Sequence, residues 1–207
     1  MNAPDPIVLA SLQIVRLKGR VTRDALSGSL QLDPQRSEQI ADGLVNDGWA
    51  SAVGAALRIT PAGRETLQQW SAAERRQVDL AALEEAYHAF DVINRHFKQL
   101  VADWQLRDGQ PNDHSDAEYD NTILDRLDAL DAEFAPLLAR IVALAPRLAH
   151  YPARLGGALE KLRSGDTSWL ARPISDSYHT VWFELHEDLI GLLGLSRLEE
   201  ALAGRAE

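Results

Sequence analysis

The pattern of hydrophobic and polar positions changes several times in the first third of the chain, and each change marks a predicted element. Residues 5–17 are apolar along most of their length, which predicts a largely buried first helix. Thr22, Asp33 and Thr60 each precede a shorter helical run, and Thr and Asp are residue types that cap helices well. The predicted order is helix, helix, helix, hairpin and helix, with the two β-like runs of the hairpin at 49–53 and 56–59.

A longer pattern follows, in which apolar side chains recur at alternating spacings of three and four residues between positions 80 and 104. This heptad spacing predicts one long helix whose apolar seam has a single polar member, Asn94. One interpretation is a dimerisation helix, because a buried Asn commonly fixes the register of a coiled coil. The other is a helix packed inside its own bundle, with Asn94 bonded to a neighbouring helix. The side chains predicted to pair between chains are Leu83, Tyr87, Phe90, Asn94, Phe97 and Val101.

The rest of the chain keeps a helical period and shows neither a strand pattern nor a glycine-rich phosphate loop. Ser115 with Glu118 predicts a capping box for a long helix, which we expect to kink or break at Pro136. Ser196 with Glu199 predicts a cap for a last short helix. The predicted fold class is mainly α: an N-terminal winged helix-turn-helix with a small β-wing, then a long helix and a C-terminal helical bundle.

Two segments, LVNDGWAS at 44–51 and LRITPAGRETL at 57–67, carry a family resemblance together with the order of elements before them. They resemble the winged helix-turn-helix of MarR-type bacterial regulators, in which similar segments close the recognition helix and the wing. The resemblance implies a DNA-binding domain at 5–75, with double-stranded operator DNA as its partner and the helix from Pro34 in the major groove. The side chains expected to contact base edges or phosphates are Thr22, Arg23, Gln35, Arg36, Ser37, Gln39 and Arg58.

The net charge of −10 comes entirely from the second part of the chain. The first 70 residues hold seven basic and seven acidic residues, whereas the rest hold fourteen basic and twenty-four acidic ones. An acidic domain at 76–207 repels polyanions, so nucleic acid would have to meet the neutral part. Arg36 is the single base on the predicted recognition helix and Arg58 is the single base on the wing. Because so few basic residues are available to contact DNA phosphates, the alternative to DNA binding is a winged helix that contacts another protein.

Several classes of protein are excluded or disfavoured by composition. The chain has no cysteine, which excludes disulfides, thiolate zinc sites and thiol nucleophiles. The first ten residues lack the basic segment and apolar core of a signal peptide. Since no apolar run approaches the roughly 18 residues that a membrane span needs, we expect a cytoplasmic protein without a membrane partner.

The segment DSYHTVWFELHEDL at 176–189 reads as a helix that contains two histidines. On a helical wheel His179 and His186 fall within the apolar stripe, whereas Glu187 and Asp188 fall on the opposite face, where we expect solvent. The histidines are seven residues apart, which is about 10.5 Å along the axis, so one metal ion cannot bind both. No nucleophile elbow is present. We therefore expect no metal site, no cofactor and no enzymatic activity.

Tryptophan and histidine are concentrated near the predicted loop at 107–116 and in the 176–189 helix. Aromatic side chains with a few polar groups between helices are typical of a small-molecule pocket. A helical core whose histidines bond to carboxylates or carbonyl groups is the competing interpretation. The side chains predicted to form an effector pocket are Trp104, Asn112, Asp113, His114, Tyr178, His179, Trp182 and His186.

A second resemblance covers DWQLRDGQPNDH, KLRSGD and DSYHTVWFELHEDLI after residue 100. These segments are similar to a helical module that accompanies winged helices in actinobacterial proteins, beside phosphoenolpyruvate-utilising, dikinase-like enzymes. The predicted function is a homodimeric DNA-binding transcriptional regulator whose acidic helical domain senses a small effector. The alternative is a winged-helix interaction module, not binding DNA, that serves as an accessory to such an enzyme.

Overall fold

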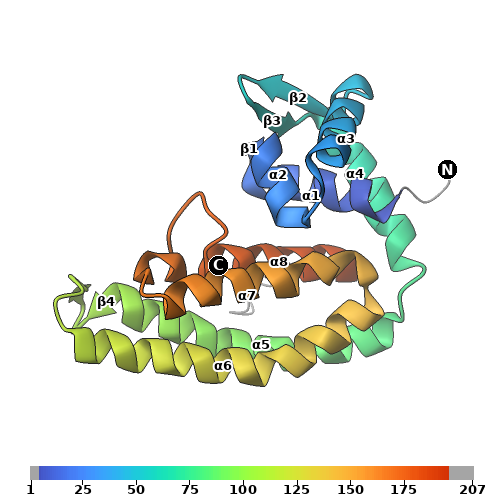
Figure 1. The fold of residues 1–207 in the computed structure, drawn as a ribbon. Helices are drawn as coiled ribbons and strands as arrows, with labels where there is room; N and C mark the ends of the chain where they lie inside the picture. The colour runs from blue at the N-terminus through green and yellow to red at the C-terminus, as the bar shows by residue number, and fades with distance from the viewer. Residues whose placement is uncertain (1–4, 196–207) are drawn as a thin grey trace.

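A computed structural model describes residues 5–195 and shows a mainly helical protein with a small antiparallel sheet (Figure 1). The described α-helices are α1 Pro6–Lys18, α2 Arg23–Leu30, α3 Pro34–Asn46, α4 Pro61–Arg75, α5 Leu80–Gln105, α6 Ala117–Leu144, α7 Tyr151–Arg163 and α8 Tyr178–Leu193. The strands are β1 Val21–Thr22, β2 Ala50–Val53, β3 Ala56–Ile59, β4 Leu106–Arg107 and β5 Gln110–Pro111. Two 3-10 helices complete the order, η1 Pro146–His150 and η2 Thr167–Leu170.

The N-terminal part, comprising α1 to α4 and β1 to β3, has its own apolar core. Its sheet has the order β1-β3-β2, with Ala50 opposite Ile59 at one end of the β2–β3 hairpin and Val53 opposite Ala56 at the other. The helix starts follow from local chemistry. Thr22, Asp33 and Thr60 cap α2, α3 and α4, each by accepting a hydrogen bond from the backbone three residues later.

The C-terminal part is a bundle of α5, α6, α7 and α8 around a second apolar core (Figure 1). The seam of α5 lies inside this bundle, because Phe90 is stacked against Trp182 of α8 and also contacts Phe134 of α6. Asn94 is bonded to a neighbouring helix, since its Oδ1 accepts the Trp182 Nε1–H at 2.9 Å. The six side chains predicted to pair between chains are each at most 7% exposed within one chain: Leu83, Tyr87, Phe90, Asn94, Phe97 and Val101.

This packing corresponds to the bundle interpretation of the seam rather than to the dimerisation interpretation. A seam already covered by helices of the same chain offers little apolar surface to a second copy. Any homodimer of this structure would therefore have to use a different surface.

Three local predictions differ from the structure. Asp116, rather than Ser115, is the N-cap of α6 and accepts bonds from the next backbone amides. The break that was one of the two outcomes expected at Pro136 does not occur, since Pro136 lies inside a continuous α6, on its exposed side, where water can hydrate the carbonyl that the proline leaves unpaired. Strands β4 and β5, each two residues long, pair as an antiparallel hairpin in a segment predicted to be a loop. The predicted helix near Ser196 lies outside the described residues.

The two parts meet through charged side chains. Lys18 of α1 pairs with Asp176 at 2.6 Å and with Glu184 of α8 at 3.0 Å. Arg154 of α7 pairs with the same two carboxylates. Ser29 of α2 also donates to Asp176. The four charges thus balance one another, as buried ions must if desolvation is to be offset.

A second buried network lies further along α8 and is centred on Asp188, which is 1% exposed. Its carboxylate accepts hydrogen bonds from Gln13 of α1 at 2.7 Å, Arg147 at 3.0 Å and Tyr151 at 2.7 Å. Burial alone would raise the pKa of Asp188, but the Arg147 guanidinium and the Tyr151 hydroxyl hold this pKa below its usual value. The expectation that this face of α8 meets solvent is therefore wrong at Asp188, because α1 and η1 cover it with matching donors.

We predict that Asp188→Ala destabilises the protein by about 3–5 kcal/mol, because Tyr151 and Gln13 lose an acceptor and Arg147 loses one of its two counter-charges, Glu74 being the other. The measurement is urea-induced unfolding followed by circular dichroism. Asp128→Ala is the matched control: it removes an exposed pair with Arg163 and should cost less than about 1 kcal/mol. Equal losses in the two variants would contradict the prediction.

We also predict that stability falls as the pH is lowered through the titration range of His150. Burial and the nearby Arg154 guanidinium lower the pKa of this imidazole to about 4. Its Nδ1 lies 3.1 Å from the Arg147 carbonyl. Below about pH 6.5 the His150 imidazole of the unfolded chain is protonated, whereas that of the folded chain takes up its proton only near pH 4. The loss between these pH values should total about 3 kcal/mol.

The measurement is the free energy of unfolding from pH 7 to pH 4 for the wild-type protein and for His150→Asn, which cannot titrate. Carboxylates distant from His150 contribute equally to both proteins, and Asp188, which interacts with His150, has a pKa below its usual value and stays ionised over this range, so the difference between the two curves reports the imidazole. Parallel curves over this range would show that His150 is not the group responsible.

Candidate functional site

Helix α3, the predicted recognition helix, buries one side and exposes the other. Ile40, Ala41 and Leu44 face the apolar core of the N-terminal part. Gln35 and Gln39 lie on the exposed side, one turn apart. This exposed side therefore presents two amide side chains, which can donate and accept hydrogen bonds at a base edge.

The charges around α3 are largely paired with one another. Arg23 forms salt bridges with Glu38 and with Asp42 at 2.8 Å, and both acids lie on α3. Arg36 pairs with Asp5 at 2.8 Å. Arg58 is exposed on β3, within the hairpin. The surface is thus polar but not strongly basic, and contact with a phosphate would have to compete with these exposed, weak pairs.

Two of the seven side chains predicted to contact DNA have structural roles. Ser37 is 2% exposed and donates its hydroxyl to the Arg23 carbonyl, so it cannot reach a phosphate. Thr22 accepts a hydrogen bond from the Ala25 amide as the cap of α2. The prediction for Ser37 is wrong, because its position on the α3 wheel faces α2 rather than solvent.

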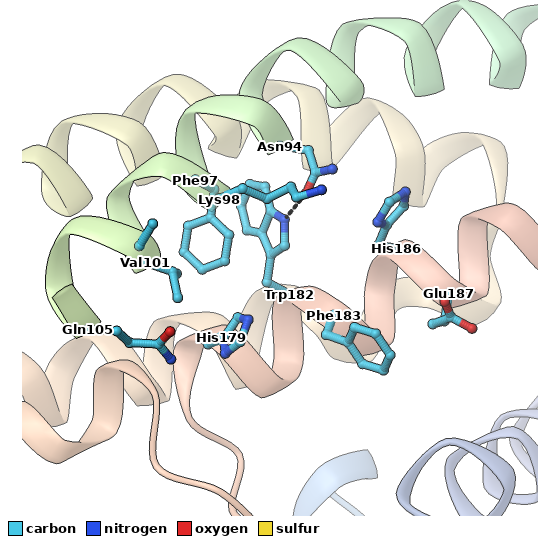
Figure 2. A pocket seen from close by; sticks show the side chains of 11 residues that line it. Asn94, Phe97, Lys98, Val101, Gln105, His179, Trp182, Phe183, His186 and Glu187 are labelled. Carbon is cyan, nitrogen blue, oxygen red and sulfur yellow. Dashed lines mark hydrogen bonds between the residues drawn. The ribbon is translucent and has the colours of Figure 1, made fainter. Parts of the chain in front are cut away.

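A groove between α5 and α8 contains part of the predicted effector pocket (Figure 2). His179, Trp182 and His186 enter it from α8, and α5 contributes the opposite wall. The cavity is about 140 Å³, which is close to the volume that holds a molecule the size of benzene. The α5 residues that line it are Asn94, Phe97, Lys98, Val101, Ala102 and Gln105.

Trp182 is the floor of this groove and is fixed on several sides. Its ring lies 4.4 Å from that of Phe97 and 4.5 Å from that of Phe134, and its indole N–H is held by Asn94. His186 lies beside it, with its Nε2 3.1 Å from the Tyr87 hydroxyl. The groove is therefore preformed, because its aromatic floor is locked by packing and hydrogen bonds.

The other predicted pocket residues lie elsewhere. The rings of Trp104 and His114 lie 4.3 Å apart and tilted to one another, next to the β4–β5 hairpin. Asn112 donates to the Trp104 carbonyl and to Asp120. Of the remaining two, Asp113 makes a local contact by accepting from the Ser115 amide, whereas Tyr178 of α8 donates across the bundle to Asp131 of α6 at 2.8 Å. The structure therefore does not bring the eight residues into one pocket.

Lys98 and Phe183 line the groove but were absent from the predicted pocket. Lys98 lies four residues after Asn94, so helical spacing alone could have placed it at the edge of the seam. It was missed because a charged residue next to an apolar stripe is usually read as a solvated neighbour.

No family model matches the chain, and neither a curated protein nor a solved structure matches it. Within residues 5–195, no group of three or more His, Asp or Glu side chains lies close enough to hold a metal ion. None of the described helices is both long and apolar enough to cross a membrane. Function is therefore inferred from the chain's own surfaces and cavities.

The bond between Asn94 and Trp182 gives a prediction about the groove. Asn94→Leu should destabilise the protein by about 1–3 kcal/mol, because the buried indole N–H loses its acceptor. Trp182→Phe removes that donor, so the two changes together should cost less than the sum of the single changes. Urea unfolding of the four proteins measures this coupling.

Asn121→Leu is the control, since Asn121 is exposed on α6 and the change should have little effect. Strict additivity of Asn94→Leu and Trp182→Phe would show that the two side chains stabilise the fold independently.

Proposed function

We propose that this chain is a DNA-binding regulatory protein whose N-terminal part is a winged helix. Helix α3 enters the major groove, and the β2–β3 hairpin contacts the adjacent backbone. The order of three helices, a hairpin and a fourth helix supports this proposal, as does the sheet order β1-β3-β2. The MarR-like segments described above fall at the end of α3 and at the junction of β3 with α4.

One observation carries the proposal: α3 and the hairpin lie on the side of the N-terminal part that faces away from the bundle (Figure 1). The side chains that join the two parts come from elsewhere, namely α1, the end of α2 and the end of α4. Gln35 and Gln39 are therefore accessible to a large partner while the rest of the molecule stays intact.

The distribution of charge determines which face of the protein would meet DNA and how tightly DNA would bind. The acidic helical part lies on the opposite side from α3, so DNA meets the neutral face. Few cations are available there, which predicts modest affinity and a shallow salt dependence. A homodimer would present two copies of α3 to successive major grooves. Such a dimer would form through surfaces outside the buried α5 seam.

A second function, protein recognition by the same surface, is favoured by one specific observation. Glu38 and Asp42 on α3 hold Arg23 in salt bridges, and both acids would lie close to the phosphates of a bound duplex. A basic or polar protein surface would meet no such repulsion. This alternative agrees with the resemblance of the C-terminal segments to a module found beside phosphoenolpyruvate-utilising enzymes.

Fluorescence anisotropy on labelled DNA from upstream of the chain's own coding sequence tests the proposal. We expect binding that weakens from about 50 to about 200 mM salt. Gln39→Ala should weaken specific binding about tenfold, because it removes a base contact. Arg58→Gln should weaken binding to all duplexes equally, because it removes a phosphate contact.

Gln69→Ala is the matched control, since Gln69 is exposed on α4 outside the proposed contact surface. Absence of any anisotropy change at low salt would refute DNA binding and favour the protein-contact function. Equal weakening by Gln39→Ala and Gln69→Ala would refute the assignment of α3 as the reading helix.

A further inference from the structure

A groove of about 450 Å³ lies where α1 and α4 of the N-terminal part meet α8 of the bundle. One wall is a polar stripe on α4, formed by residues spaced four, three and four apart: Arg64, Gln68, Ser71 and Arg75. The facing wall includes Gln13 and Arg16 of α1. Residues of α8 and Leu195 close the remaining side. The volume falls within the range of about 300–1,000 Å³ typical of small-molecule sites.

The charges in this groove do not balance, although the whole chain is acidic. Arg147 pairs with both Asp188 and Glu74, so this cluster carries one net negative charge, which is outweighed by Arg16, Arg64 and Arg75. Arg75 donates to the carbonyls of Gly191 and Leu192 at the end of α8. Among the described residues, the side chain of Arg16 is held by a hydrogen bond to Gln13, at 3.1 Å. Glu187 is the other acid among the lining residues, which leaves the groove with a surplus of positive charge.

Arg16 and Arg64 are the two guanidinium groups placed to receive a ligand. Within residues 5–195, neither of them forms a salt bridge. Arg16 is half-buried on α1 and Arg64 is exposed on α4. Two guanidinium groups on adjacent helices, with a hydroxyl and an amide in the lining of the same groove, match the charge and the hydrogen-bonding capacity of a phosphate group.

The other cavity at the boundary of the two parts is larger, about 640 Å³, but its chemistry is different. Its acids, Asp176 and Glu184, are already neutralised by Lys18 and Arg154. The cavity is also lined by Arg20, a single exposed cation, whereas the groove at Arg16 and Arg64 has two guanidinium groups outside salt bridges of the described residues. The groove at Arg16 and Arg64 is therefore the site that selects a ligand by charge.

We propose that this groove binds a small phosphate monoester. Arg16 and Arg64 hold the phosphate, Gln68 and Ser71 donate to its oxygens, and the more accessible apolar side chains of Ala72 and Leu195 cover the body of the ligand. Ligand binding joins both parts of the chain, so occupancy stabilises their relative position. This site is independent of DNA binding by α3.

Isothermal titration calorimetry of the full chain at low ionic strength tests the proposal with three probes. We expect phenyl phosphate to bind more tightly than inorganic phosphate, because its ring is buried against the apolar lining. Benzyl alcohol, which lacks the phosphate, should give no measurable heat. Inorganic phosphate binding as tightly as phenyl phosphate would overturn the monoester assignment, and no binding by either would overturn the site.

Charge-removing variants locate the phosphate. Arg16→Gln and Arg64→Gln should each weaken phenyl phosphate binding about tenfold, because a charge-assisted hydrogen bond is lost. Arg76→Gln is the matched control: Arg76 is exposed just beyond α4 and outside the groove, and the change should leave affinity unaltered. Equal weakening by Arg64→Gln and Arg76→Gln would mean non-specific attraction and would overturn the proposal.

A blocking variant tests the groove without removing charge. A side chain added at Gly191 meets no atom within 4 Å, so Gly191→Leu should keep α8 intact while narrowing the groove. We expect at least tenfold weaker binding of phenyl phosphate. Gly157→Leu, at a similarly open glycine of α7 outside the groove, should not change the affinity. Unchanged binding in Gly191→Leu, with a native circular dichroism spectrum, would overturn the location.

DNA affinity separates this inference from the proposed function. If α3 reads DNA, Arg16→Gln and Arg64→Gln should lose phenyl phosphate binding but retain the wild-type anisotropy curve. A parallel loss of DNA affinity would show that these arginines contact nucleic acid phosphates, and it would overturn the assignment to a small ligand.

Discussion

The arrangement of this protein depends on α8, which is buried on two sides by different chemistry. On one side Trp182 packs among the rings of α5 and α6. On the other side Glu184 and Asp188 are matched by Arg154 and Arg147 and by donors from α1. Replacing such buried ion pairs by apolar residues is often neutral or stabilising, so their contribution is better understood as orientation than as net stability. They fix how the N-terminal part sits on the bundle.

Local signals in the sequence predicted the starts of several elements. Asp33 followed by Pro34 and Thr60 followed by Pro61 begin α3 and α4 as expected. These signals work because a cap and the amide that it receives are only three residues apart. Ser115 shows where such local signals are insufficient. Both Ser115 and Asp116 are residue types that cap helices, and in the structure Asp116 is the N-cap of α6.

Long-range partners could not be predicted in the same way. A spacing of three and four shows that side chains share one face of α5, but not whether that face meets another helix of the chain or a second copy. The helical wheel of α8 likewise placed its carboxylates and its aromatic side chains on opposite faces. It could not show that α1 and η1 would cover the carboxylates of Glu184 and Asp188. The predicted effector pocket included too many residues for a related reason. Trp104 lies ten residues beyond Asn94, which is about 15 Å along the helix axis, so one groove of benzene-like size cannot include both.

The separation of surfaces constrains how the molecule can be regulated. Helix α3 lies on one side of the N-terminal part, whereas the groove at Arg16 and Arg64 lies on the side that meets the bundle. Between them the core of α1, α2 and α4 is closely packed, and packed cores resist gradual deformation. A ligand in the groove would therefore act on the N-terminal part as a whole, by stabilising its orientation on α8. In a protein that binds DNA as a dimer, holding this orientation would fix the spacing of two α3 helices and leave the contacts within each of them intact.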